Sequence, residues 1–148
     1  MSDLRDLYQE VILDHNKRPR NFRVIDPCTH HADGYNPLCG DRVTVYLDVQ
    51  DGIIRDVAFQ GSGCAISSAS ASLMTEALKN RPVAEVEPLF QDFHDAVMGD
   101  GLPSPAKLGK LIALAGVRDY PSRVKCATLA WHALRAALEH REEPVATE

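Results

Sequence analysis

The sequence contains no long run of apolar residues. Residues 1–6 form no apolar segment, and no later stretch approaches the length of a signal-peptide core or a membrane span. Basic residues are not in excess either, because 16 lysines and arginines face 21 aspartates and glutamates, which gives a net charge of -5. An acidic balance argues against general binding to nucleic acids. We therefore expect a cytoplasmic protein that binds neither membranes nor nucleic acid.

The sequence also has no cysteine pair with the spacing of a zinc finger. Its four cysteines are Cys28, Cys39, Cys64 and Cys126, and no two of them form a Cys-x-x-Cys motif. Four cysteines could form two disulfides in a secreted chain, but in a reducing compartment free thiols are the default. Any site that these residues share must therefore be assembled by the tertiary fold.

Length and composition are ordinary and predict one domain over residues 1–148. Apolar residues make up 45% of the chain and charged residues 25%, as in typical globular proteins. A domain of this size buries roughly 70% of the surface of its unfolded chain, so it needs no metal or disulfide to fold. A metal bound by this chain is therefore expected to do more than hold the fold together.

Alternating patterns predict a small antiparallel sheet. Residues 42–49 and 53–60 alternate between apolar and polar side chains, which indicates two strands, and Asp51-Gly52 between them is a hairpin signal. A further strand is expected within residues 22–34. The apolar side of the second strand is expected to hold Ile53, Val57 and Phe59.

Apolar residues at helical spacing predict helices around this sheet. They cover residues 3–16, 65–79, 83–97, 108–115 and 127–140. The fold class is therefore α+β, with an antiparallel sheet of about three strands flanked by an N-terminal helix and several C-terminal helices.

The residues Cys39-Gly40-Asp41 place a thiol and a carboxylate on one loop. The glycine between them lets the loop fold sharply enough to aim both side chains inward. Cys64 and Cys126 each come just before a helical pattern, where the helix dipole and free N–H groups favour a thiolate. Three thiolates select zinc, copper(I) or iron–sulfur species, and the carboxylate is the most exchangeable ligand. The four side chains together predict a metal site that handles sulfur.

The charge of such a site makes nearby cations relevant. Zinc(II) bound by three thiolates and one carboxylate carries a formal charge of -2, so cationic neighbours would help to hold it together. Arg123 and Lys125 flank Cys126 and are the candidates. The alternative is that both side chains simply face solvent before a helix.

Other reactive residues support weaker interpretations. Cys28, His30 and His31 lie in an aperiodic stretch without a second ligand pair nearby, which favours a surface loop over a second metal site. A cysteine hydrolase would need a His–Cys pair, and nothing singles out His15 or His132 for that role. A zinc deaminase is disfavoured because its His-x-Glu and Cys-x-x-Cys elements are missing.

Several motifs occur together in a recognisable order. They are Asp14-His15 with Pro19-Arg20-Asn21, then Asn36-Pro37-Leu38-Cys39-Gly40-Asp41, then Gly61-Ser62-Gly63-Cys64-Ala65-Ile66-Ser67 with Met74-Thr75-Glu76, and Val124-Lys125-Cys126. From Leu4 to Leu138 the chain resembles the IscU/SufU (NifU N-terminal) family of iron–sulfur cluster assembly proteins. The resemblance implies an α+β fold in which the three cysteines and the aspartate converge at one exposed end.

Two features resemble the SufU type more than the scaffold type of this family. Lys125 stands where scaffold-type members have a histidine, and residues 120–125 only loosely resemble their chaperone-recognition motif. The interval between Cys64 and Cys126 is also longer, as in the SufU type.

Resemblance to the SufU type implies a zinc-dependent sulfurtransferase. Zinc would be bound by the residues Cys39, Asp41, Cys64 and Cys126, while Cys28 matches no ligand of the family. Persulfide sulfur would be accepted on Cys39 from a cysteine desulfurase of the SufS/IscS kind and passed to downstream assembly or acceptor proteins.

Two alternatives stay open at this point. In the first, the protein is a scaffold on which iron and sulfide form a [2Fe-2S] cluster bound by the same cysteines, with Asp41 nearby and Cys126 taking the sulfur. In the second, the zinc site is structural and serves partner docking. Whether the protein is an enzyme depends on which of these descriptions holds.

Overall fold

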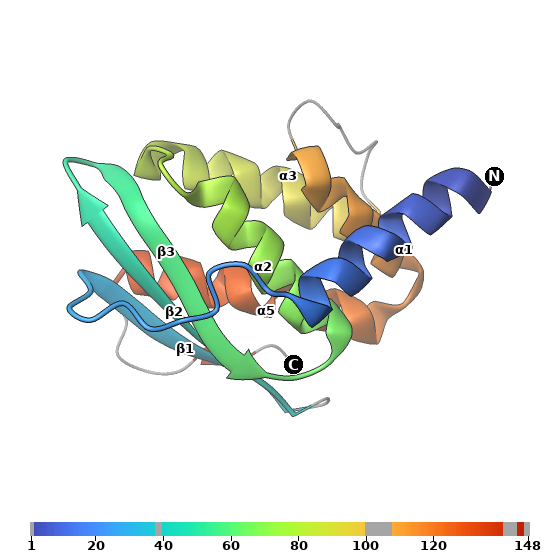
Figure 1. Cartoon of the computed structure of the whole chain (residues 1–148), viewed down its shortest axis with the longest axis horizontal. Coiled ribbons are helices and arrows are strands. Elements are labelled where there is room, and N and C mark those ends of the chain that lie inside the picture. The colour runs from blue at the N-terminus through green and yellow to red at the C-terminus, as the bar shows by residue number, and fades with distance from the viewer. Residues whose placement is uncertain (1, 38–39, 100–107, 141–144, 147–148) are drawn as a thin grey trace.

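The architecture is α+β, as predicted. The structure, a computed structural model, describes residues 2–37, 40–99, 108–140 and 145–146. An N-terminal helix precedes a sheet, and the other helices follow it (Figure 1). The elements, with η for a 3-10 helix, are α1 (Ser2–Lys17), β1 (His30–Asn36), β2 (Asp41–Gln50), β3 (Ile53–Ser62), α2 (Ala65–Leu78), η1 (Val83–Glu85), α3 (Val86–Met98), η2 (Gly109–Asp119), α5 (Pro121–Leu138) and β4 (Val145–Ala146).

The sheet has the strand order β3-β2-β1-β4, in which β2 is antiparallel to both β1 and β3. The strand expected within residues 22–34 is β1, which begins at His30 and continues to Asn36. The predicted hairpin between β2 and β3 is confirmed. Asp51 and Gly52 both have positive φ angles, 54° and 75°, the combination that a tight two-residue turn requires and that this Asp-Gly pair supplies.

One detail of β3 differs from the prediction. Asp48 pairs with Asp56 but the next residue, Val49, pairs with Ile54, so Arg55 is an extra residue in the strand. A bulge of this kind reverses which side chains face the core. Ile54 is therefore fully buried in place of Ile53, while Val57 and Phe59 are buried as predicted.

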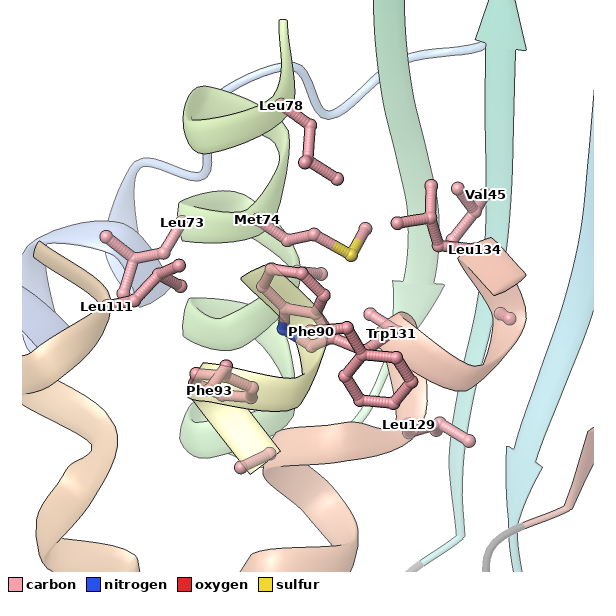
Figure 2. Close-up of a cluster of buried hydrophobic side chains, with 14 of the residues drawn as sticks. Val45, Leu73, Met74, Leu78, Phe90, Phe93, Leu111, Leu129, Trp131 and Leu134 are labelled. Atoms are coloured by element: carbon pink, nitrogen blue, oxygen red, sulfur yellow. The ribbon is translucent and has the colours of Figure 1, made fainter. Parts of the chain in front are cut away.

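Helices cover one face of the sheet (Figure 1). α5 packs on β1 and β2, and α2 packs on β3. Gly34 in β1 allows the close approach of α5, because a Cβ there would lie 3.1 Å from Leu129 and 3.3 Å from Ala133. Figure 2 shows the core between the layers, where Trp131 on α5 meets Phe93 on α3 with ring centroids 4.9 Å apart. This packing fixes α2 and α5 relative to the sheet.

Both edges of the sheet are partly covered by other segments of the same chain. The segment after α1 runs along β3 (Figure 1), where Phe59 donates its backbone N–H to Asn21 (3.0 Å) and accepts from Arg23 (3.1 Å). At the other edge, β4 is parallel to β1 and pairs with Gly34 and Tyr35.

A network of hydrogen bonds attaches the end of α1 to α2. The Ser72 hydroxyl accepts from the backbone N–H of Arg20 (2.8 Å) and lies 2.7 Å from Nδ1 of His15, which is 1% exposed. The other ring nitrogen of His15, Nε2, lies 3.4 Å from Oε1 of Glu76, so the two nitrogens contact α2 at two neighbouring turns. The side-chain amide of Asn21 also donates to Thr75 (3.0 Å). The motif Asp14-His15 with Pro19-Arg20-Asn21 therefore meets the motif Met74-Thr75-Glu76, and this contact positions α2.

This network predicts that acid destabilises the protein through His15. Burial, and then the charge of Arg20, lower the pKa of His15 below its usual value, against opposing effects of Glu76 and Asp14. Unfolded His15 therefore binds a proton that folded His15 does not, so the free energy of unfolding falls as pH drops through about 6.5. This loss is measured by urea unfolding at several pH values between about 8 and about 5, a range that spans the usual histidine pKa.

The effect is isolated by comparing variants, because the pKa values of His30 and His132 are also lowered by burial. His15→Gln should show a weaker dependence on pH than the wild type. His31→Gln, at an exposed position, is the control variant. Equal pH dependence in His15→Gln and the wild type would contradict this role of His15.

Candidate metal centre

Asp41 is the first residue of β2 and is completely buried. Its Oδ1 atom accepts a hydrogen bond from the backbone N–H of Cys64 (2.9 Å). Gly63 makes this contact possible, because a Cβ at Gly63 would overlap Oδ1 of Asp41. The carboxylate therefore sits against the backbone at the turn from β3 into α2, and its chain neighbour Gly40 is exposed at the surface.

Cys64 is the N-cap residue of α2, as predicted. Its Sγ atom accepts from the backbone N–H of Ser67 (3.4 Å), at the positive end of the helix dipole. The thiol also lies 4.0 Å from Oδ2 of Asp41. The side chain is half-buried and Gly63 before it is exposed, so this part of the site lies near the surface.

Cys126 does not precede a helix, as the sequence suggested, but lies inside α5. The helix begins at Pro121 because proline fits the first turn, where no backbone N–H is needed. Cys126 is 1% exposed, and its thiol donates to the carbonyl of Ser122 (3.5 Å), four residues earlier. Cys126 therefore lies past the first turn of α5, so the stabilisation of a thiolate that was expected from a helix N-terminus does not apply there.

The structure brings three of the four predicted ligands together. The ligand atoms of Asp41, Cys64 and Cys126 all lie within 4.8 Å of one another. At Zn–S distances near 2.3 Å, two sulfurs of a tetrahedral site lie roughly 3.8 Å apart, so contraction by about 1 Å would let all three atoms bind one ion. Two thiols and a carboxylate also match the donor types that zinc prefers. The arrangement fits a metal in spacing and in chemistry.

Cys39 lies outside the described residues. The loop that contains it is closed by a cross-strand pair, Asn36 with Asp41, and by a hydrogen bond from the backbone N–H of Gly40 to the carbonyl of Asn36 (2.8 Å). Gly40 has φ +71°, a conformation that favours glycine at this turn. The role of Cys39 stays a prediction.

Arg123 and Lys125 lie in the first turns of α5 on either side of Val124. Arg123 is exposed and Lys125 is half-buried. Neither makes an ion pair with another residue that the structure describes. Their proposed effect on the charge of the site stays a prediction.

Asn36 is a residue of the site that sequence reasoning missed. Its side chain is completely buried and donates from Nδ2 to Oδ2 of Asp41 (3.5 Å) and to Sγ of Cys126 (3.6 Å). The motif around Cys39 contains Asn36, but no local pattern indicates a contact with a residue 90 positions later. Gly63 was missed as well, although its place between β3 and Cys64 is a signal for close backbone approach.

The other reactive residues take no part in this cluster. His30 stacks on His140 with ring centroids 4.3 Å apart, His31 is exposed, and Cys28 is half-buried. His15 contacts Ser72 and Glu76, while the ring of His132 packs against Phe90 at 5.3 Å. Among the described residues, the three ligands above are the only group of His, Cys, Asp or Glu residues close enough to share an ion.

No helix in the described part of the chain combines the length and apolar character needed to cross a membrane.

Comparison with known proteins adds four findings. The family model of the NifU-like N terminal domain matches residues 7–144. The chain is 39% identical over 141 residues to the zinc-dependent sulfurtransferase SufU of Bacillus subtilis (strain 168), covering 95% of each chain. It is also 39% identical over 139 residues to the iron-sulfur cluster assembly scaffold protein IscU of Streptococcus pyogenes serotype M1, covering 94% of this chain and 87% of that one. A crystal structure from Fervidobacterium islandicum AW-1, described as an iron-sulfur cluster assembly scaffold protein for the SUF system, matches with a TM-score of 0.82 and 34% identity, over 87% of this chain and 94% of that one.

Proposed function

Because the chain belongs to the NifU-like N-terminal domain family, we propose that it is a zinc-dependent sulfurtransferase of iron–sulfur cluster assembly. It accepts persulfide sulfur from a cysteine desulfurase on Cys39 and delivers that sulfur to downstream assembly or acceptor proteins. The observation that carries this proposal is the convergence of the ligand atoms of Asp41, Cys64 and Cys126 within 4.8 Å. Similarity to the B. subtilis sulfurtransferase supports it.

The three described ligands are held by regular structure. Asp41 starts β2, Cys64 caps α2 and Cys126 lies in α5, so the core fixes their positions. Cys39, in contrast, belongs by sequence to the segment that joins β1 to β2. A site with three anchored ligands and a fourth on a connecting segment suits the exchange of that fourth ligand. Zinc, when bound, keeps coordinating thiols deprotonated at neutral pH.

The sulfur transfer itself needs no oxidant or reductant. The Cys39 thiolate attacks the terminal sulfur of the desulfurase persulfide, a bond forms between Cys39 and that sulfur, and the desulfurase S–S bond breaks. The electron pair of the broken bond leaves on the desulfurase cysteine as a thiolate, and the persulfide stays on Cys39. Arg123 and Lys125 would lower the electrostatic cost of holding several anions in this region.

The second candidate is a scaffold for a [2Fe-2S] cluster. It is favoured by the name of the S. pyogenes relative, which matches at the same identity as the sulfurtransferase. In this description Cys39, Cys64 and Cys126 bind the cluster, Asp41 lies nearby, and Cys126 takes the sulfur. Lys125 before Cys126, where scaffold-type members have histidine, favours the first candidate.

Metal and sulfide content distinguish the two candidates. The protein should be purified without oxygen from cells that also express its desulfurase, and zinc, iron and acid-labile sulfide should be measured. We expect one zinc per chain, no visible colour and no sulfide, because three thiolates and one carboxylate form a closed zinc site. Iron and sulfide in equal amounts, with a visible absorption band, would overturn the sulfurtransferase in favour of the scaffold.

A further inference from the structure

We infer that Asn36 is a positioning residue of the metal centre, whose side-chain amide holds Asp41 and Cys126 in the arrangement that binds the ion. The inference rests on the metal site of the proposed function. Asn36 is completely buried, and its Nδ2 atom lies 3.5 Å from Oδ2 of Asp41 and 3.6 Å from Sγ of Cys126. One amide group thus contacts two of the three described ligands.

The chemistry of the partners fixes the orientation of this amide. A carboxylate offers only acceptor atoms, and a metal-bound thiolate likewise accepts hydrogen bonds. The NH2 group of the Asn36 side chain has two N–H donors, one for each partner. The oxygen of the same amide can only accept hydrogen bonds. The NH2 end must therefore face Asp41 and Cys126.

The backbone holds Asn36 in place independently of the ligands. Asn36 is the last residue of β1 and is the cross-strand partner of Asp41. Its carbonyl accepts from the N–H of Gly40 (2.8 Å), which closes the segment between β1 and β2. The side chain then reaches Cys126 in α5, 90 residues away in sequence. Asn36 thereby connects the sheet, the segment containing Cys39 and the C-terminal helix at one point.

Two effects of this contact favour the bound metal. The amide orients Asp41 Oδ2 and Cys126 Sγ before the ion arrives, so less freedom is lost on binding. Its N–H dipoles also stabilise negative charge on both ligands, in a site whose formal charge with zinc is -2. Groups of this kind, which bond to ligands without touching the metal, typically change metal affinity by about 10- to 100-fold.

Asn36→Leu tests the inference, because leucine has a similar size and leaves the backbone hydrogen bond to Gly40 in place. Zinc affinity is measured by competition with a chromophoric chelator, and the cobalt(II)-loaded protein reports ligand geometry through its absorption spectrum. We expect about 10-fold weaker zinc binding and an altered cobalt spectrum. Asn36→Ser, which is too short to reach both acceptors, should also bind zinc more weakly and serves if the leucine variant does not fold.

Asn16→Leu is the control. It removes the same amide from an exposed position of α1. We expect this variant to bind zinc as tightly as the wild type. The inference is overturned if a folded Asn36 variant binds zinc with wild-type affinity, or if Asn16→Leu is weakened as much as Asn36→Leu. Wild-type protein that binds no zinc would instead contradict the proposed function.

Discussion

Cys39→Ser is expected to reduce sulfur acceptance from the desulfurase to background. Serine has nearly the same size as cysteine, but its hydroxyl is not a nucleophile toward a persulfide at neutral pH. The variant should therefore fold and still leave Asp41, Cys64 and Cys126 in place. The measurement is radioactive sulfur transferred from labelled cysteine in the presence of the desulfurase, together with the stimulation of desulfurase turnover.

Two further cysteine variants make this result specific. Cys28→Ser should accept sulfur normally, because Cys28 is half-buried and takes no part in the cluster of described ligands. Cys126→Ser should weaken metal binding and so reduce transfer indirectly. Normal transfer to Cys39→Ser would refute the role of Cys39. If the label were found on Cys126, the scaffold would become the better description.

Gly63→Ala is expected to disable the metal centre, with zinc affinity lowered by about 100-fold, near the upper end for changes that displace a ligand without removing it. The added Cβ would overlap Oδ1 of Asp41 and lie 3.1 Å from the Asp41 Cβ. Asp41 is completely buried, and the hydrogen bond from Cys64 N–H holds its carboxylate against this backbone. The carboxylate must rotate away, which also breaks its hydrogen bond to Cys64 N–H.

Gly116→Ala is the matched control for this change. A Cβ at Gly116 meets no atom within 4 Å, so this variant should bind zinc as tightly as the wild type. Zinc affinity by chelator competition and zinc content after dialysis both measure the effect. Retention of wild-type affinity by Gly63→Ala would mean that Asp41 is not needed for binding the ion.

The parts of the fold that local patterns control were predictable. Alternation placed β2 with Val45 and Leu47 buried, and the Asp-Gly pair located the hairpin, because both depend on neighbours in sequence. The bulge at Arg55 was not predictable, since it depends on pairing with β2 across the hairpin. The bulge places Ile54 rather than Ile53 in the core, and the alternation of apolar and polar residues does not indicate this change.

The site was predictable in composition more than in geometry. Cys64 caps α2 as expected, because glycines and then a helical pattern surround it in sequence. Cys126 was misplaced relative to its helix, since Pro121 lets α5 begin before the apolar stripe does. The contact of Asn36 with Cys126 depends on how α5 lies on β1; Gly34 permits that close approach, but nothing near it in sequence indicates which helix packs there.

The covered edges of the sheet have a consequence for how partners are recognised. Exposed strand edges are templates on which foreign strands add and chains aggregate. Here the backbone of Phe59 in β3 is already paired with the segment after α1, and Gly34 and Tyr35 in β1 are paired with β4. A partner that added a strand at these positions would first have to displace the segment after α1 or β4. At these positions contacts with other chains are therefore made through side chains, and the sheet offers no backbone groups there for another strand to pair with.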